Sequence, residues 1–398
     1  MNYRTAIAKR NFELLLMFPF VLLGRLAGKI FPLRTTHDVF LFFPSGDIGG
    51  APKVNIDITN CIKDKKPLII FSKVPKNNKF LHLYNNIEGV RIIDLHKYVD
   101  NKLYHFVNFF FRGVITAWVN KAKQPVIFGG ESTYFYKIVP HVKKGTRIVE
   151  LCHLNNLFNY SQAFVKYIDL RIFSSPAIKR DVEKQYRRNG VPGHYFNRLK
   201  FIDNKVDIPE LSKADNETLQ IVFVGRGAAQ KRVHLLAQIA KKAHELGKNM
   251  HFSFAGDVET IIPEDVQEYC TLYGNVNDNN KLNDIYNKSD VLILTSLYEG
   301  LPIVVMDMMA RAKVILSTSV GSIPDYVTHR ENGILITETD ESLIIEQALN
   351  YLDELNNDKP LREYLGKSAR QYAIAHFSGE QFCAAYRNAI FNEYTPTL

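Results

Sequence analysis

Short apolar strands alternate with helical stretches along most of this chain, and this alternation constrains its fold more than any other feature. The first series begins after residue 34 with an apolar run that ends at Pro44. Helical stretches separate most of the strands expected in this series, at 38–43, 67–71, 90–94, 125–128, 147–152 and 170–173. Apolar strands divided by helices predict a parallel sheet that is covered on both faces.

A second series follows a polar stretch, 203–217, which contains Pro209 and many charges. Its expected strands lie at 219–224, 251–255, 291–294, 314–317 and 334–336, with helices at 233–246, 281–287 and 301–312. A chain of 398 residues exceeds the size at which one hydrophobic core divides into two. We therefore predict an α/β fold of two Rossmann-like domains facing a cleft at the carboxyl ends of their sheets, where such sheets bind ligands.

An acidic motif directly follows the apolar strand at 291–294. It runs from Leu297 to Asp307 and reads Leu-Tyr-Glu-Gly-Leu-Pro-Ile-Val-Val-Met-Asp. The first acid, Glu299, falls on the strand-to-helix loop, and Asp307 falls about two turns into the helix, so both could bind hydroxyl groups of one ligand. The N–H groups after Gly300 would point out of the helix start toward a phosphate or sugar oxygen. A capped helix with two unrelated acids is the alternative.

A basic loop follows the first strand of the same series and reads Val224-Gly225-Arg226-Gly227-Ala228-Ala229-Gln230-Lys231. Glycine allows a ligand to approach the backbone closely. Arg226 and Lys231 offer two positive charges to a diphosphate. Such spacings are common, so the loop alone does not indicate a diphosphate site. The acidic motif at the same edge of the predicted sheet supports this interpretation.

The two motifs, in this order, resemble the C-terminal domain of retaining GT-B glycosyltransferases, in particular glycosyltransferase family 4. That family pairs a Gly-Arg…Lys loop with two acids at the spacing of Glu299 and Asp307, although the second acid here is Asp rather than Glu. Further similar segments lie at 204–207, 255–257, 286–291, 320–325 and 376–378. The resemblance is clear from about residue 169 to the C-terminus.

The resemblance implies roles for individual residues. Glu299 would bind the donor sugar's hydroxyl groups, Arg226 and Lys231 the diphosphate, and Asp307 the ribose. Backbone contacts to the donor would come from Gly225, Gly300, Leu301 and Pro302. In the first domain, Gly49 and Gly50 would approach the donor phosphate or the acceptor, and His153 would contact the donor sugar, with Glu131 as a weaker candidate. Catalysis would then rest on Glu299, His153, Arg226 and Lys231.

The N-terminal charge, the two series of strands and the resemblance together predict a domain plan. A basic apolar segment at 1–35 precedes an acceptor domain at 36–203. A hinge at 204–218 leads to the nucleotide-sugar domain at 219–377. A helix at 378–398 would return to the first domain.

The activity implied is transfer of a sugar, with retention at the anomeric carbon, from a nucleotide-diphosphate donor. We expect UDP rather than GDP, no cofactor and no metal ion. The acceptor would be a saccharide or lipid-linked saccharide of a bacterial surface polysaccharide such as lipopolysaccharide. The alternatives are a nucleotide-sugar 2-epimerase on the same fold and a non-catalytic membrane partner protein.

The N-terminus concentrates positive charge, with six basic residues and one acid in residues 1–34 of a chain whose net charge is +9. The ten uncharged residues from Leu14 to Leu23 are too few to span a bilayer. We favour a segment that lies on an anionic membrane surface, at the inner face of the cytoplasmic membrane; a helix packed on the domain is the alternative. Nucleic-acid binding is not expected, because no such motif accompanies the charge.

Four cysteines, Cys61, Cys152, Cys270 and Cys383, lie far apart. Their scatter argues against a disulfide framework or a zinc site and predicts four structural thiols in a reducing cytoplasm.

Overall fold

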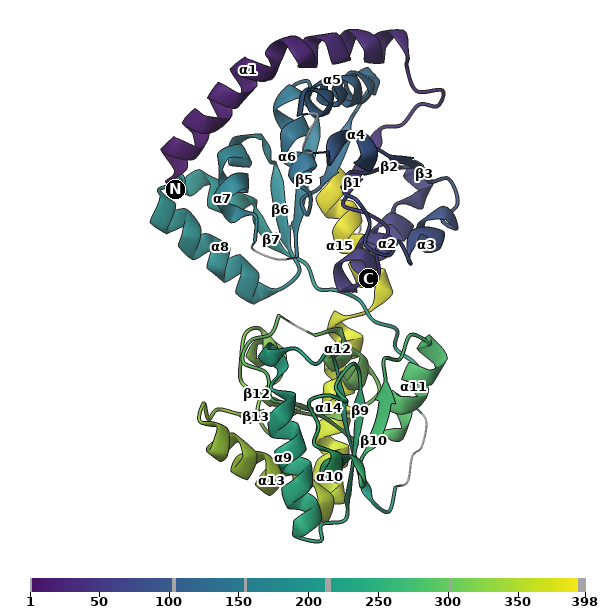
Figure 1. Cartoon of the computed structure of the whole chain (residues 1–398), viewed down its shortest axis with the longest axis vertical. Helices are drawn as coiled ribbons and strands as arrows, with labels where there is room; N and C mark the ends of the chain where they lie inside the picture. Colours follow the sequence, from purple (N-terminus) through teal and green to yellow (C-terminus); the bar gives the residue numbers. More distant parts are fainter. Residues whose placement is uncertain (1, 102–104, 154–155, 212–215, 301, 393–398) are drawn as a thin grey trace. The chain divides into compact units, whose positions relative to one another are not determined.

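The computed structural model describes residues 2–101, 105–153, 156–211, 216–300 and 302–392. The chain divides into two compact units. Unit 1 comprises residues 1–204 and 380–398, and unit 2 comprises residues 205–379 (Figure 1). Each unit is built on one parallel sheet, which confirms the predicted pair of Rossmann-like domains.

The sheet of unit 1 has seven strands in the order β3-β2-β1-β4-β5-β6-β7. The strand order reverses between β1 and β4, as in dinucleotide-binding folds. Six of its strands match the predicted ones within one residue, and β7 was not predicted. The strands are β1 (Val39–Phe43), β2 (Leu68–Phe71), β3 (Arg91–Asp94), β4 (Val126–Gly129), β5 (Arg147–Cys152), β6 (Leu170–Phe173) and β7 (Leu199–Phe201).

The sheet of unit 2 has six strands in the order β10-β9-β8-β11-β12-β13. The short strand β10 was not predicted, because its residues are only half-buried and carry no apolar run. The strands are β8 (Leu219–Val224), β9 (Met250–Ala255), β10 (Thr271–Gly274), β11 (Val291–Leu294), β12 (Val314–Thr318) and β13 (Ile334–Ile336).

Helices cover both faces of each sheet. Those of unit 1 are α1 (Tyr3–Ile30), α2 (Gly50–Cys61), α3 (Leu81–Asn85), α4 (His96–Val99), α5 (His105–Lys121), α6 (Thr133–Ile138), α7 (Phe158–Ser161), α8 (Pro176–Asn189) and α15 (Gly379–Phe391). Those of unit 2 are α9 (Val233–Glu245), α10 (Glu264–Gln267), α11 (Asn279–Lys288), α12 (Ile303–Ala310), α13 (Glu341–Asn357) and α14 (Lys359–His376).

The strand β1 shows why the sheet of unit 1 requires cover on both faces. Phe40 and Phe42 point into a core with Ile115 and Phe135, while Leu41 and Phe43 point into another core on the opposite face. All five residues of β1 are buried. Successive side chains of a strand point to opposite faces, so an uninterrupted apolar strand needs helices on each side.

The last helix, α15, completes the second of these cores. Its Phe382 and Tyr386 pack in the cluster that contains Phe128 of β4 and Val54 of α2. In Figure 1 this helix, drawn in yellow, lies among the elements of unit 1 although it comes from the end of the chain. Unit 1 is therefore assembled from both ends of the sequence.

The prediction of four free thiols was wrong for two of them. Cys61, the last residue of α2, forms a disulfide bond with Cys383 of α15 across a sequence separation of 322 residues. The ion pair between Arg387 and Asp64, with 2.6 Å between Nη1 and Oδ1, lies beside it. No sequence motif joins these cysteines, because only the return of α15 brings them together. The cysteines therefore no longer support a reducing cytoplasm. Cys152 and Cys270 form no disulfide bond in the structure.

The N-terminal segment forms one long helix, α1, of 28 residues, which includes Pro19. It packs along α5 (Figure 1). Glycines of both helices lie at this contact. A Cβ on Gly24 would lie 1.9 Å from the carbonyl oxygen of Phe110, and one on Gly113 would lie 2.1 Å from that of Val21. The two backbones are therefore too close for any larger residue at these positions. No helix in the described part of the chain is long and apolar enough to cross a membrane.

Candidate active site

The basic loop of unit 2 leaves the carboxyl end of β8 against the loop that follows β9. The Gly225 N–H donates to the carbonyl of Ala255 at 2.9 Å. Gly256 has a φ of +140°, and a Cβ there would lie 1.8 Å from the Gly225 oxygen, so only glycine fits. This packing leaves Arg226 exposed, with no partner among the described residues.

Lys231 and Glu299, predicted from separate motifs, meet in the structure. Their Nζ and Oε1 atoms are 2.5 Å apart, and the side chains are 16% and 7% exposed. The Ser296 hydroxyl donates to the same carboxylate oxygen at 2.5 Å. The second oxygen of Glu299 accepts no hydrogen bond from the described residues. Glu299 is thus held in place while one oxygen stays available.

The loop that carries Glu299 is held by the loops on either side of it. The Leu297 N–H donates to the Gln230 carbonyl at 2.8 Å, and the Ser322 N–H donates to the Glu299 carbonyl at 3.2 Å. Gly321 has a φ of +60°, and a Cβ there would lie 1.6 Å from the Glu299 oxygen. Loops after β8, β11 and β12 therefore converge at one edge of the sheet, where parallel sheets bind ligands.

Arg232 connects two of these loops, and the sequence analysis missed it. It is buried and has a φ of +47°, an uncommon backbone conformation for a residue other than glycine. Its Nε donates to the Thr295 carbonyl at 2.6 Å and its Nη2 to the Ser296 carbonyl at 3.3 Å. Burial lowers the pKa of this guanidinium, and Glu341 opposes the shift. Its position directly after Lys231 was the only available signal.

The start of α12 differs from the prediction. The helix begins at Ile303, so Pro302 is the residue before the helix rather than part of its first turn. Pro302 has a φ of −64° and a ψ of 134°, an extended conformation that no interior helical residue adopts. Leu301 lies outside the described residues. A Cβ built on Gly300 would meet no atom within 4 Å, so the backbone beside Glu299 is open to a ligand.

Asp307, the second acid of the motif, lies on α12 with its side chain 22% exposed. Its carboxylate is 3.4 Å from Nη1 of Arg311, one turn further along the helix. Arg311 also donates to Asn283 at 2.6 Å and lies over the ring of Tyr286. The sequence analysis did not single out Arg311, whose spacing of four residues from Asp307 was the signal for the pair.

The candidate residues of unit 1 also follow the carboxyl ends of strands. Gly49 is the N-cap of α2, and Gly50 is its first residue, after β1. Glu131 follows β4, and its carboxylate accepts a hydrogen bond of 2.7 Å from Asn55 Nδ2 of α2. His153 follows β5. The structure thus places these residues along one edge of the sheet.

Two buried polar atoms at this edge, Nε2 of His153 and Oδ1 of Asn55, have no hydrogen-bond partner among the described residues. Burial lowers the pKa of His153, while the Glu131 carboxylate acts in the opposite direction. The imidazole is therefore neutral at pH 7, when one of its ring nitrogens can accept a hydrogen bond. Sequence analysis missed Asn55, which lies within a helix and belongs to no motif.

Among the residues that the structure describes, no group of three or more His, Cys, Asp or Glu side chains is placed to hold a metal ion.

Residues 205–372 match the family model described as Glycosyl transferases group 1. Capsular polysaccharide biosynthesis glycosyltransferase CapM of Staphylococcus aureus is 27% identical over 193 residues, which are 47% of this chain and 50% of CapM. N-acetyl-alpha-D-glucosaminyl L-malate synthase of Bacillus anthracis is 23% identical over 213 residues, 48% of this chain and 52% of the relative. The chain thus spans about half the length of the curated relatives it matches.

The fold is also similar to solved structures. Anabaena HepE in complex with UDP and glucose has a TM-score of 0.69 at 15% identity, with 89% of this chain and 99% of that one covered. The apo form of the lipopolysaccharide outer core galactosyltransferase WaaB has a TM-score of 0.66 at 18% identity, with the same coverage.

Both units have the architecture of GT-B glycosyltransferases, which confirms the predicted fold class. Within unit 2, residues 205–372 match the model of group 1 glycosyltransferases, and this similarity supports the prediction of a glycosyltransferase. Nothing in these similarities favours the epimerase or the non-catalytic partner.

Proposed function

We propose that this protein transfers a sugar from a nucleotide-diphosphate donor, a UDP-sugar rather than a GDP-sugar, which binds at the carboxyl edge of the unit 2 sheet. The observation that carries the proposal is the Lys231–Glu299–Ser296 cluster, with the exposed Arg226 in the same loop as Lys231. A free cation suits a diphosphate, and a fixed carboxylate oxygen suits a sugar hydroxyl. The complex of HepE with UDP and glucose supports this choice of ligand.

The reaction breaks the bond between the anomeric carbon and the diphosphate, and negative charge builds up on the departing group. Arg226, Lys231 and backbone N–H groups near Gly225 and Gly300 would stabilise that charge, the largest electrostatic task of the step. Glu299 would orient the sugar through its free oxygen, and Asp307 would bind the ribose. The departing phosphate takes the proton of the acceptor hydroxyl, so transfer with retention requires no separate protein base. Arg226 and Lys231 would take the place of a metal ion at the diphosphate.

We assign the acceptor side to unit 1. Its Gly49 and Gly50, Glu131 and the neutral His153 lie along the edge of one sheet, and two buried atoms there lack partners among the residues that the structure describes. Such unsatisfied atoms are costly unless a ligand completes them. His153 would also contact the donor sugar. The relatives named for capsular polysaccharide and lipopolysaccharide support a saccharide or lipid-linked saccharide acceptor of a bacterial surface polymer.

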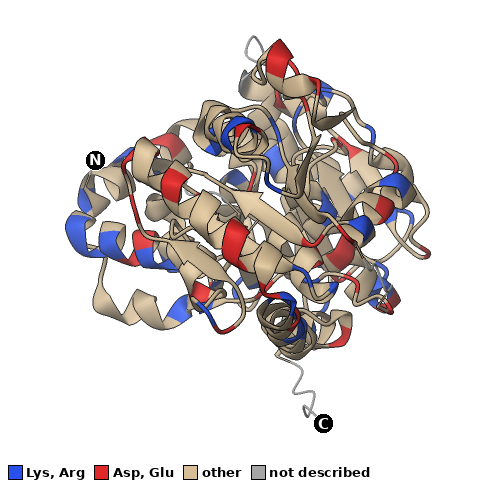
Figure 2. Ribbon diagram, turned by 90° about the horizontal axis from the view of Figure 1, so that it is seen from below, with Lys and Arg blue, Asp and Glu red and all other residues tan. Residues whose placement is uncertain are grey.

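We further propose that the protein works at the inner face of the cytoplasmic membrane as a peripheral protein. The support is α1, which carries basic residues and has many apolar side chains that are exposed in the structure. Basic apolar helices of this kind bind anionic membrane surfaces. Acidic and basic residues are interspersed over most of the described part of the chain (Figure 2), so the N-terminal excess of positive charge is local.

A donor panel tests the activity. The protein is incubated with UDP-glucose, UDP-galactose, UDP-N-acetylglucosamine and GDP-mannose, with and without extracted lipid-linked saccharides, and products are identified by mass. Turnover of one UDP-sugar is expected. Glu299→Gln or Arg226→Ala should reduce it about 100-fold or more, because the first loses the carboxylate that orients the sugar and the second loses a cation that stabilises the leaving diphosphate.

Lys242→Ala, at an exposed position of α9, is the matched control and should retain full turnover. Full turnover in Glu299→Gln or Arg226→Ala would refute the assignment of the site. A UDP-N-acetylglucosamine that is only epimerised would instead identify an epimerase.

A further inference from the structure

Contacts along its length hold α1 in a fixed rotation on unit 1. The guanidinium of Arg112, which is 2% exposed on α5, lies 3.3 Å from the Glu13 carboxylate of α1. Arg10 is buried and donates to the carbonyl of Ala163. With the close packing at Gly24 and Gly113, these contacts determine which side of α1 faces outward.

The outward side of α1 is apolar over most of its length. Eight large apolar side chains of the helix are between 44% and 73% exposed, namely Phe12, Leu15, Leu16, Phe18, Leu22, Leu23, Leu26 and Ile30. We call these residues the outer face. A contiguous apolar surface of this kind marks an interaction site.

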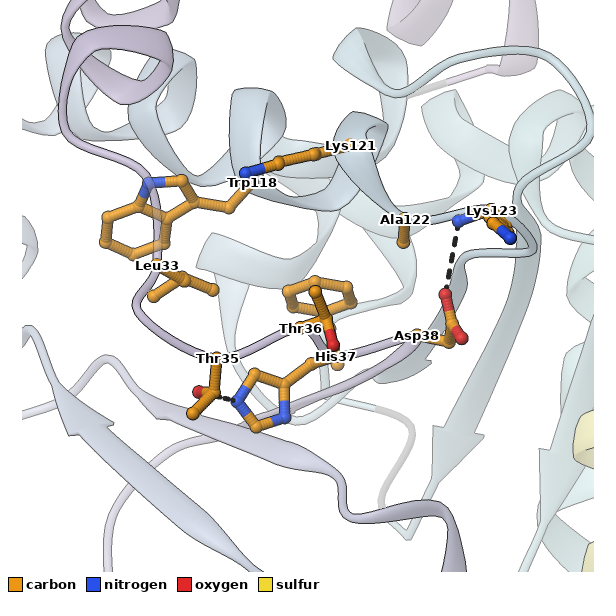
Figure 3. Close-up of a pocket in the computed structure, with 10 residues that line it drawn as sticks. Leu33, Thr35, Thr36, His37, Asp38, Trp118, Lys121, Ala122 and Lys123 are labelled. Carbon is orange, nitrogen blue, oxygen red and sulfur yellow. Dashed lines mark hydrogen bonds between the residues drawn. The ribbon is translucent and has the colours of Figure 1, made fainter.

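Two neighbouring cavities open where the end of the outer face meets α5. The larger, about 640 Å³, is lined by Leu22, Arg25, Leu26, Lys29 and Lys121 among others. The smaller, about 280 Å³, shares Lys121 and adds Leu33, His37 and Trp118 (Figure 3). We call the two together the α1–α5 groove. Its volume falls in the range of small-molecule sites.

The charges of the groove are mostly positive. Arg25, Lys29, Lys121 and Lys123 line it, and Asp38 is the single acid among the lining residues. Asp38 accepts a hydrogen bond of 3.2 Å from the Lys123 backbone. Arg25 donates through Nη2 to the His141 carbonyl at 2.8 Å, while its buried Nε has no partner in the described part of the chain. The groove therefore fits an anion.

The groove lies at the opposite end of the unit 1 sheet from the candidate active site. Thr35 to Asp38, which line the smaller cavity, precede β1, whereas Gly49, Glu131 and His153 follow their strands. The groove is therefore separate from the residues that we assign to the donor and to the acceptor saccharide.

We propose that the α1–α5 groove binds the phosphate headgroup of an anionic phospholipid, whose acyl chains lie along the outer face within a bilayer. The inference extends the proposed membrane location by naming the lipid class and the residues that select it. Charge complementarity favours this occupant, because cations sit at the end of an apolar surface and would meet headgroup phosphate while the outer face enters the acyl region. Trp118, which donates through Nε1 to the Phe31 carbonyl, lies at this boundary, where tryptophan is favoured.

Trp118 is the single tryptophan of the chain and provides a local readout. The full-length protein is titrated with vesicles that mix phosphatidylcholine and phosphatidylglycerol, in which only one of the two lipids carries brominated chains. Wild-type fluorescence should be quenched more strongly, and to saturation, by brominated phosphatidylglycerol. The substitution pair Lys29→Gln and Lys121→Gln, both at exposed positions, should abolish that preference and weaken binding by tenfold or more.

The matched control is Arg4→Gln with Arg34→Gln, which removes the same charge from exposed positions near α1 but outside the groove lining. It should keep the preference for phosphatidylglycerol. Equal losses in the two variants would overturn the headgroup site and leave only diffuse attraction, and equal quenching by both lipids in the wild type would overturn it as well. Glycerol phosphate in solution should not displace the protein from the vesicles, which would support a bilayer lipid as the ligand. Saturable binding of glycerol phosphate in the absence of vesicles would overturn the assignment to a bilayer lipid.

Turnover of the UDP-sugar without vesicles is measured on the same variants. It should be unchanged, because the groove holds none of the proposed catalytic residues. A protein that binds lipid as described but turns over no sugar nucleotide would contradict the proposed function and not the groove.

Discussion

Lys231 and Glu299 are 68 residues apart in the sequence, yet their charged atoms are 2.5 Å apart. Each was predictable as a ligand-binding residue because each follows a strand of the same sheet. Their ion pair, the donation from Ser296 and the left-handed Arg232 were not predictable, because they depend on how three loops pack. The same limit applies to Asn55, which gains meaning only when α2 is placed beside Glu131.

Asp47, in the loop that leads to Gly49, gives a prediction at this scale. Burial acts to raise its pKa, but hydrogen bonds from the backbone N–H groups of Lys76, Asn77 and Asn78 lower it to about 2. Because the pKa is below that of the unfolded chain, the stabilisation is present above about pH 4 and is lost as the pH falls toward 2. Asp47→Asn should cost about 2 kcal/mol at pH 7 and much less near pH 2.

Urea unfolding followed at Trp118, which reports on unit 1, measures this difference. Glu363→Gln, at an exposed position of unit 2, is the control and should not change the transition. A cost for Asp47→Asn that is the same at pH 7 and pH 2 would contradict the assigned role.

At the scale of elements, the strands were predicted best. A short apolar run such as Val39–Phe43 indicates a buried strand, whereas β7 and β10 are short and half-exposed and contain no such run. The N-terminal segment illustrates the opposite case. Its sequence left a membrane surface and a packed helix open as alternatives, and α1 has one face packed on α5 and another face exposed.

The packing of α1 on α5 depends on glycine. Gly24→Ala or Gly113→Ala should destabilise unit 1 by about 1–3 kcal/mol, because the new methyl group would overlap the backbone of the facing helix. Gly193→Ala is the matched control, since a Cβ there meets no atom within 4 Å. Urea unfolding followed at Trp118 measures both, and equal stability of the three variants would show that α1 is not held as described.

For the whole molecule, the sequence supported two Rossmann-like domains and predicted that the last helix returns to the first of them, but it missed the disulfide bond that joins this helix to α2. The disulfide between Cys61 and Cys383 closes a loop that contains the whole of unit 2. Neither cysteine has a partner nearby in the sequence, and pairing follows only from the position of α15. Sequence patterns reveal residues that are neighbours within one element or one motif. The two cysteines lie in different helices far apart in the sequence, so no pattern indicates their bond.

Reduction of this disulfide should loosen α15. A cross-link over so long a loop contributes about 2–4 kcal/mol, so Cys383→Ser should increase hydrogen exchange in residues 379–391. Cys270→Ser, at a free thiol of unit 2, should leave exchange there unchanged. Titration of four thiols in the unfolded, unreduced protein would show that the bond does not form.

The central claim is that the carboxyl edge of the unit 2 sheet binds a nucleotide diphosphate. Calorimetric titration of the full-length protein with UDP tests it most directly. Wild-type protein should bind UDP with one site, and Arg226→Ala with Lys231→Ala should weaken binding tenfold or more, since each loses a charge-assisted hydrogen bond. The matched pair Lys242→Ala with Lys281→Ala, at exposed positions, should bind as the wild type does. No UDP binding by the wild type, or undiminished binding by the variant that lacks Arg226 and Lys231, would contradict the claim.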